Sequence, residues 1–278
     1  MNNLALKFSV PGGVEQAESF IAVLTSIGYE GFQEEESSLI AYISEALFEQ
    51  QDLEEVLKLE AFEGISLIAK EIQQEQNWNA IWESAYEAVT IAGRCHVRAP
   101  FHPSNKDVEF ELVIEPKMSF GTAHHETTSM MVSLLLETNV AGKSMLDMGS
   151  GTGILAILAR KLGAQPVVAV DNDVWAVNNA NDNILLNNTP DVEIVMGDAS
   201  WLVKTGRTFE LVFANINRNI LLNDMQFYEA ALLPHGMLIM SGFYADDLEL
   251  LRQNATKLGL QFVRMIENNH WAAAVFQK

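Results

Sequence analysis

The spacing of apolar and polar residues divides the chain into two regions with different patterns. Residues 4–10 alternate in the manner of a strand, and apolar side chains then recur at helical spacing over 15–27 until Gly28. The pattern continues with strands at 29–34 and 38–44, an acidic amphipathic helix at 48–59 and a strand at 65–72. The resulting order β-α-β-β-α-β predicts a small ferredoxin-like α+β domain over residues 1–72.

The second region follows a segment that we interpret as a linker. Residues 77–89 place Trp78 and Trp82 on one helical face, and we predict a linker helix at 73–95. Strands near 95–99 and 108–114 come next. Beyond residue 144 the pattern predicts strands at 145–148, 167–170, 192–195, 211–214 and 237–240, helices at 154–162, 174–186, 219–232 and 246–258, and a last strand pair at 262–266 and 272–276. Such alternation predicts a doubly wound, Rossmann-like α/β sheet over residues 96–278, mostly parallel with an antiparallel strand at its end.

Charge limits the partners of the first region. The formal net charge of the 278 residues is −20, and residues 1–95 hold four Lys/Arg against 17 Asp/Glu. An acidic surface repels phosphate backbones and attracts basic proteins, so direct nucleic-acid binding is disfavoured there. The alternative is a solvated acidic surface that serves solubility.

Hydropathy and cysteine content indicate a compartment. The chain has no run of about 18 apolar residues and no basic-then-apolar leader, so we predict neither a membrane span nor a signal peptide. The single cysteine, Cys95, excludes an internal disulfide and favours a reducing compartment, and we therefore predict a cytoplasmic protein. We interpret Cys95 as a strand residue rather than as a nucleophile.

A glycine-rich loop carries the main chemical signal. The stretch Asp147-Met-Gly-Ser-Gly-Thr-Gly153 follows an apolar strand and opens a helix, so the backbone at Gly149 and Gly151 can approach a ligand closely. Its spacing is G-x-G-x-G, which differs from the G-x-G-x-x-G of dinucleotide sites and lacks the Gly-Lys-Ser/Thr of a Walker loop. Asp171 ends the next strand, where a carboxylate can accept both hydroxyls of a ribose. Asp198, after the third strand, either bonds an adenine amino group or is a surface loop acid.

These residues carry a resemblance to a known family. Residues 146–157 resemble motif I of the class I S-adenosylmethionine-dependent methyltransferases. The whole chain resembles the ribosomal protein L-eleven methyltransferase family, through Phe120-Gly-Thr-Ala-His-His-Glu-Thr-Thr128, Ala169-Val-Asp-Asn-Asp-Val-Trp-Ala-Val177, Ala214-Asn-Ile216 and Leu238-Ile-Met-Ser-Gly242. It departs from the family pattern at Ala123, Glu126 and Ser150, where glycine, proline and cysteine are usual.

The resemblance implies a function and assigns site residues. It implies a protein N-methyltransferase that uses S-adenosyl-L-methionine to methylate lysine ε-amines and the N-terminal α-amine of the large-subunit ribosomal protein L-eleven, a basic protein substrate. It also implies that the N-terminal domain recognises this substrate. The family's cofactor-binding positions correspond to Thr128, Gly149, Asp171 and Asn215, and we expect Phe120 to cover the cofactor. Capping of a helix is the alternative role for Thr127-Thr128.

The transfer site is predicted around the end of the fourth strand. Asn215 lies beside the expected switch point of the sheet, where its amide oxygen can accept a hydrogen bond from an incoming amine or from the amino group of the cofactor. The run Asn215-Ile-Asn-Arg218 lacks the Pro-Pro-aromatic pattern of adenine methylation, which favours an amine substrate. His125 is a candidate general base, with a polar loop position as the alternative. Trp271 is either a wall of the substrate channel or a core residue, and no spacing indicates a metal site.

Other functions are consistent with parts of the pattern. An N-methyltransferase for another protein or a small amine would keep the same cofactor site. A non-catalytic adenosylmethionine-binding module would bind the cofactor without turnover, although it would not need the stretch around Phe120 or Asn215. The glycine spacing opposes a nicotinamide dehydrogenase.

Overall fold

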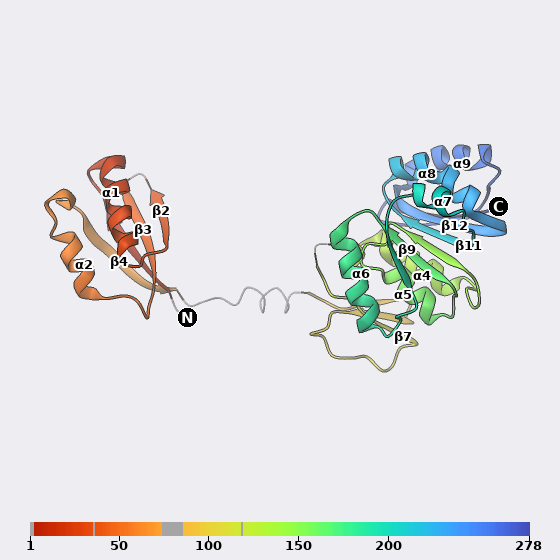
Figure 1. The fold of residues 1–278 in the computed structure, drawn as a ribbon, viewed down its shortest axis with the longest axis horizontal. Helices are drawn as coiled ribbons and strands as arrows, with labels where there is room; N and C mark the ends of the chain where they lie inside the picture. The colour runs from red at the N-terminus through yellow and green to blue at the C-terminus, as the bar shows by residue number, and fades with distance from the viewer. Residues whose placement is uncertain (1–2, 36, 74–85, 118) are drawn as a thin grey trace. The chain divides into compact units, whose positions relative to one another are not determined.

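The computed structural model describes residues 3–35, 37–73, 86–117 and 119–278. It divides into two compact units, an N-terminal unit (Met1–Ala85) and a C-terminal unit (Tyr86–Lys278) (Figure 1). No helix in the described ranges combines the length and the apolar character needed to cross a membrane.

The N-terminal unit has the predicted ferredoxin-like arrangement. Its elements are β1 (Asn3–Ser9), α1 (Gly13–Ser26), β2 (Gly31–Glu35), β3 (Ser38–Ser44), α2 (Gln50–Leu57), a 3-10 turn η1 (Glu60–Phe62) and β4 (Ser66–Gln73). The strands pair in the order β2-β3-β1-β4, all antiparallel, with both helices on one face (Figure 1). Alternate residues of β3, Leu39, Ala41 and Ile43, are buried against that layer, as the period-2 pattern requires.

The predicted linker helix at 73–95 falls mainly on residues outside the described ranges. Its last part is wrong, because Val89–Ile91 forms a strand, β5. This strand pairs antiparallel with β6 (Cys95–Arg98), and β6 pairs parallel with β7 (Phe110–Val113). The C-terminal unit therefore begins at Tyr86, ahead of the boundary at residue 96 that the sequence suggested.

The large sheet of the C-terminal unit confirms the predicted α/β class. Its elements are α4 (Glu126–Glu137), β8 (Met145–Met148), α5 (Ile154–Lys161), β9 (Val167–Asp171), α6 (Val174–Leu186), β10 (Glu193–Met196), α7 (Ser200–Thr205), β11 (Phe209–Asn215), α8 (Arg218–Ala231), β12 (Leu232–Tyr244), η2 (Ala245–Asp247), α9 (Leu248–Lys257), β13 (Gln261–Asn268) and β14 (Trp271–Gln277). The strand order is β10-β9-β8-β11-β12-β14-β13. Six strands run in the same direction, and β14 runs antiparallel between β12 and β13. The short helix α7 was not predicted.

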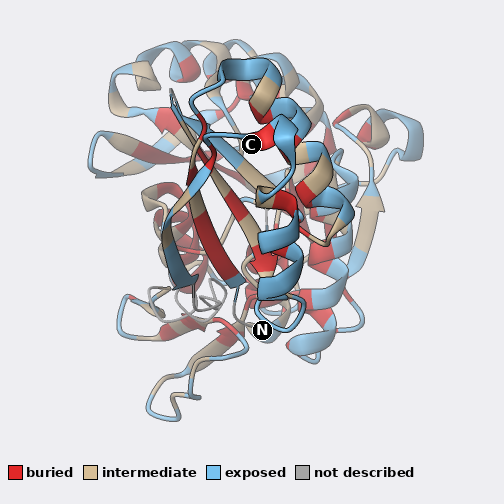
Figure 2. Cartoon of the chain, turned by 90° about the vertical axis from the view of Figure 1, so that its left-hand side faces the viewer, coloured by how far each residue is buried: buried red, intermediate tan, exposed pale blue. Residues whose placement is uncertain are grey.

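Both faces of this sheet are buried, which explains its continuous apolar strands. Helices α4, α5 and α6 cover one face, and α7, α8 and α9 cover the other (Figure 1). Successive residues of β8 point to opposite cores, with Met145 in one and Leu146 in the other. In Figure 2 the helices are accordingly exposed on their outer faces and buried where they meet the strands.

The joint between β8 and α5 contains a buried acid. Asp147 is 1% exposed, and its Oδ2 accepts a hydrogen bond from the Ala156 backbone N–H at 3.2 Å. Its Oδ1 is buried without a hydrogen-bond partner. Burial, with a smaller contribution from the charge of Asp171, raises the pKa of the Asp147 carboxyl to about 7. The neutral acid therefore fits this position better than the carboxylate.

The raised pKa predicts a pH-dependent stability. The folded state holds the Asp147 proton up to about pH 7, whereas the unfolded chain releases it near pH 4. The stabilising contribution is thus complete below pH 4 and is lost as the pH rises to about 7, a loss on the order of 1–4 kcal/mol. Asp147→Asn resembles the neutral acid and should remove this loss.

Urea unfolding from about pH 5 to 8 measures the free energy of unfolding of the wild type and of Asp147→Asn. The control is Asp107→Asn, at an exposed position. If the free energies of the wild type and Asp147→Asn change with pH in parallel, the raised pKa is not that of Asp147.

Candidate functional site

A first cavity of about 410 Å³ opens at the carboxyl ends of β8, β9 and β11. This is the point of the sheet where the strand order reverses, the usual ligand position in doubly wound folds. Its lining combines the glycine loop (149–153), the ends of three strands and one face of α8: Ser119, Phe120, Met148, Gly149, Gly151, Val170, Asp171, Asn172, Asp173, Ala176, Gly197, Asp198, Ala199, Asn215, Ile216, Ile220 and Asp224. The structure thus brings together Phe120, Gly149, Gly151, Asp171, Asp198 and Asn215, six of the predicted site residues.

The glycine loop is shaped by two close approaches. At Gly151, which has φ of 54°, a Cβ atom would lie 2.3 Å from the backbone oxygen of Phe120. At Gly149, with φ of 69°, a Cβ atom would lie 2.6 Å from Cγ1 of Ile216. Side chains larger than hydrogen would therefore force the loop away from the 119–125 loop or from the end of β11.

Asp171 supports the glycine loop from the next strand. Its Oδ2 accepts from the Gly151 backbone N–H at 2.8 Å, and its Oδ1 accepts from the Asp173 backbone N–H at 3.0 Å. Each carboxylate oxygen has a second lone pair, so these bonds leave acceptor capacity toward the cavity. The same side chain can hold the loop and accept from a ligand hydroxyl.

Four acidic residues line the first cavity, and its lining includes no lysine or arginine. They are Asp171, Asp173, Asp198 and Asp224. Hydrogen bonds from the Ser200 side chain and backbone lower the pKa of the Asp198 carboxyl, which is therefore ionised at neutral pH. The cavity thus favours a ligand that carries hydroxyl or amino donors and positive charge.

A second cavity of about 230 Å³ adjoins the first. Phe120, Asn215 and Ile216 line both cavities and form the wall between them. Three rings line part of the second cavity, where the His125 ring lies 5.2 Å from Phe120 and 4.9 Å from Trp271 between centroids. Trp271 lines this cavity, as one of the two interpretations of the sequence had it.

Asn215 presents an unpaired acceptor in the shared wall. Its Nδ2 donates to Thr128 Oγ1 at 3.3 Å, and its Oδ1 is buried without a hydrogen-bond partner. Thr128 is 1% exposed on α4 and lines neither cavity. The structure therefore places Thr128 beneath Asn215, where it orients the amide. A buried amide oxygen without a partner is costly, which points to a ligand donor at this position.

The His125 side chain caps the N-terminus of α4. Its Nδ1 accepts from the Thr127 backbone N–H at 3.2 Å and so caps α4. The neutral ring then carries its proton on Nε2 and has no free lone pair for an amine proton. This geometry favours His125 as a cap and cavity wall over the general-base role that we predicted for it.

Sequence reasoning missed the polar supports of the glycine loop. Buried Asn183 donates from Nδ2 to Thr152 O at 2.9 Å and accepts at Oδ1 from the Glu115 backbone N–H at 2.9 Å. Asn187 bonds both backbone groups of Val113. The four-residue spacing of Asn179, Asn183 and Asn187 puts them on one helical face, a signal of buried asparagines that the sequence did contain. Within the described ranges, no group of three or more potential metal ligands is found.

Known proteins resemble this chain over nearly its full length. It is 42% identical to the ribosomal protein L11 methyltransferase of Phocaeicola vulgatus, over 99% of both chains. It is 45% identical to the protein of that name from Porphyromonas gingivalis, over 92% of this chain and 88% of the relative. The crystal structure of the ribosomal protein L11 methylase from Lactobacillus delbrueckii subsp. bulgaricus superimposes with a TM-score of 0.62 at 27% identity, over 69% of this chain and 98% of that one. The family model for ribosomal protein L11 methyltransferase matches residues 7–278, and the chain belongs to this family.

Proposed function

We propose that this protein is an S-adenosyl-L-methionine-dependent N-methyltransferase that methylates lysine ε-amines and the N-terminal α-amine of ribosomal protein L11. The observation that carries the proposal is the unpaired Asn215 Oδ1 in the wall between the two cavities. On one side lies an acidic cavity with a glycine loop, and on the other lies a small aromatic cavity. Direct transfer of a methyl group requires the two reacting atoms to lie about 3–3.5 Å apart, so the two ligands must occupy adjoining cavities.

The residues of the first cavity fit the proposed cofactor. Asp171 would accept the ribose hydroxyls, Asp198 would accept from the adenine amino group, and the backbone at Gly149 and Gly151 would lie against the amino-acid end. The acidic lining complements a ligand with a positive sulfonium. When bound, the cofactor supplies an electrophilic methyl carbon, and the protein must align an amine with it.

The second cavity fits a neutral amine. A lysine amine in water has a pKa of about 10.4 and is protonated at neutral pH. Contact with the rings of Phe120, His125 and Trp271 would remove part of the water around the amine and lower that pKa, because burial disfavours the charged form. Asn215 Oδ1 would accept one amine N–H and so direct the nitrogen lone pair toward the first cavity. Thr128 keeps this oxygen in place through its bond to Nδ2.

Charge and the names of the relatives support the choice of substrate. The relatives at 42% and 45% identity are both named for ribosomal protein L11. Residues 1–95 carry a net charge of −13, which complements a basic protein and opposes direct contact with nucleic acid. We assign substrate recognition to the N-terminal unit and a cytoplasmic location to the enzyme.

Methyl transfer to the purified substrate tests the proposal directly. The full chain should transfer labelled methyl groups from S-adenosylmethionine to ribosomal protein L11, at lysine side chains and at the N-terminus. Peptide mass spectrometry identifies the modified amines. A folded protein that binds the cofactor and labels small amines but not L11 would move the assignment to another substrate, and one that labels no amine would be a binding module.

Asp171→Ala should weaken cofactor binding. Loss of hydrogen bonds to a charged acceptor removes about 1.5–3 kcal/mol, or roughly 10- to 150-fold in Kd. Calorimetry with S-adenosylmethionine measures it. Asp171→Asn keeps one acceptor oxygen for the Gly151 N–H and separates loop support from ribose binding, and exposed Asp246→Ala is the control for charge. Unchanged affinity in Asp171→Ala would refute the ribose role.

Asn215→Ala should reduce turnover more than it reduces stability. Removal of the oriented acceptor should lower kcat by on the order of 10- to 100-fold. The melting temperature should fall only modestly, because Oδ1 has no partner in the folded protein and the one bond lost is the 3.3 Å contact from Nδ2 to Thr128. Thr128→Val, which leaves Asn215 in place but removes the partner of its Nδ2, should give a smaller loss of kcat. Asn181→Ala, at an exposed position on α6, is the matched control, and equal kcat in Asn215→Ala and wild type would contradict the proposal.

A further inference from the structure

The chain enters the C-terminal unit through residues 86–88, the junction segment, whose first two carbonyl groups are both bonded by histidines. His102 Nε2 lies 2.6 Å from Tyr86 O, and His124 Nε2 lies 2.8 Å from Glu87 O. A carbonyl oxygen can only accept, so both ring nitrogens carry hydrogen and donate. The Tyr86 ring lies near both histidines, 5.9 Å from His102 in a stacked geometry and 4.5 Å from His124. Two loops therefore hold one short segment of backbone.

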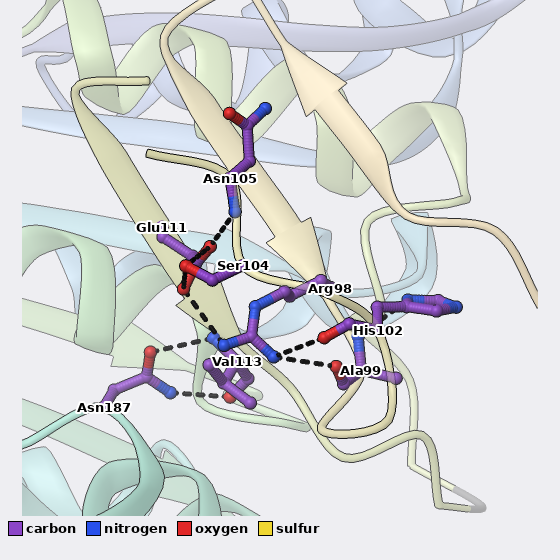
Figure 3. Close-up of polar contacts among 8 residues, drawn as sticks. All are labelled: Arg98, Ala99, His102, Ser104, Asn105, Glu111, Val113 and Asn187. Atoms are coloured by element: carbon purple, nitrogen blue, oxygen red, sulfur yellow. Dashed lines mark hydrogen bonds and ion pairs between the residues drawn. The ribbon is translucent and has the colours of Figure 1, made fainter. Parts of the chain in front are cut away.

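The loop that carries His102 is itself fixed by a polar network (Figure 3). The Arg98 guanidinium donates to the backbone oxygens of Ala99 and His102, each at 3.1 Å, and forms an ion pair with Glu111 at 3.0 Å. Glu111 also accepts from the Ser104 hydroxyl and from a backbone N–H of the same loop. His102 is thus a fixed point, attached to β6 and β7.

The loop that carries His124 is the 119–125 loop, which shapes both cavities. On its inner side, Thr152 donates from its backbone N–H to Phe120 O at 3.0 Å and from its hydroxyl to Gly121 O at 2.6 Å. On its other side, His124 bonds Glu87, and its ring packs against that of Tyr86. Between these attachments, Ala123 has φ of 71°, a strained value for a residue with a side chain. Attachments at both ends are what hold a strained residue in place.

We propose that His124 is a positioning residue for methyl transfer, which ties the 119–125 loop to the junction segment and thereby holds the neighbouring His125 at the second cavity. This inference rests on the proposed function. His124 lines neither cavity, so it acts through its neighbours and does not touch the reacting atoms. Because the Thr152 bonds remain, loss of His124 disturbs the amine side of the site and spares the cofactor side.

The test compares His124→Ala with His124→Gln in the full chain. His124→Ala should lower kcat on L11 by about tenfold, since small displacements of positioning groups have effects of this size. Its Kd for S-adenosylmethionine should stay within about twofold of wild type. The glutamine Nε2 can still donate to Glu87 O, so His124→Gln should recover most of the lost kcat. His235→Asn is the control, because asparagine tolerates the φ of 66° at that position.

A second readout does not depend on the methyl acceptor. Hydrogen exchange of the backbone amides at 122–127 and 87–91 should be faster in His124→Ala and near the wild-type rate in His124→Gln. Unchanged exchange and unchanged kcat in His124→Ala would overturn the proposal. It would also be overturned if His124→Ala lost kcat, cofactor affinity and melting temperature together and His124→Gln did not restore them. If the wild-type protein does not methylate L11, but His124→Ala still shows faster exchange and His124→Gln restores it, the proposed substrate is wrong and the positioning role of His124 is supported.

Discussion

The contact between Gly151 and the backbone oxygen of Phe120 is the constraint on which the site depends. A Cβ atom at residue 151 would lie 2.3 Å from that oxygen, so the two loops touch only because residue 151 has no side chain. Thr152 then fastens the contact with two hydrogen bonds to Phe120 and Gly121. Phe120 consequently stands between the cavities, and the loop that shapes the first cavity also sets one wall of the second.

Buried polar groups that line neither cavity hold the two loops and Asn215 in position. Asn183 joins the Thr152 oxygen to the backbone beyond β7, and Thr128 joins α4 to Asn215. Each of these groups is buried and paired, so displacement of either loop would leave a polar atom without a partner. Asn215 Oδ1 is buried and unpaired, and so are Asp147 Oδ1, Ser150 Oγ and Asn179 Nδ2. Of these four residues only Asn215 lines the cavities, so its oxygen is the one that a ligand can reach.

The fold and most of the first cavity were predictable because they follow from local patterns. Glycine spacing, strand alternation and the acid at the end of β9 are adjacent in sequence to the elements that they define. The strand β5 and the role of Thr128 were not predictable in this way. Val89–Ile91 is a strand because β6 lies beside it, and Thr128 is identified by an amide 87 positions away. His125 shows the same limit, since its capping bond, which the sequence does not display, decides which nitrogen carries the proton.

The choice of a neutral amide at position 215 follows from the charges around it. The first cavity is already acidic, and a carboxylate in the wall would extend that field to the second cavity. There it would stabilise an ammonium ion and raise the pKa of an incoming amine, which opposes loss of the proton before transfer. In the proposed site, the asparagine oxygen would accept a hydrogen bond from the amine, and it carries no charge that would retain the proton. With a neutral amide at position 215, the first cavity can attract a positive ligand through its acidic residues. The second cavity can still orient a neutral amine, because no negative charge reaches it from this position.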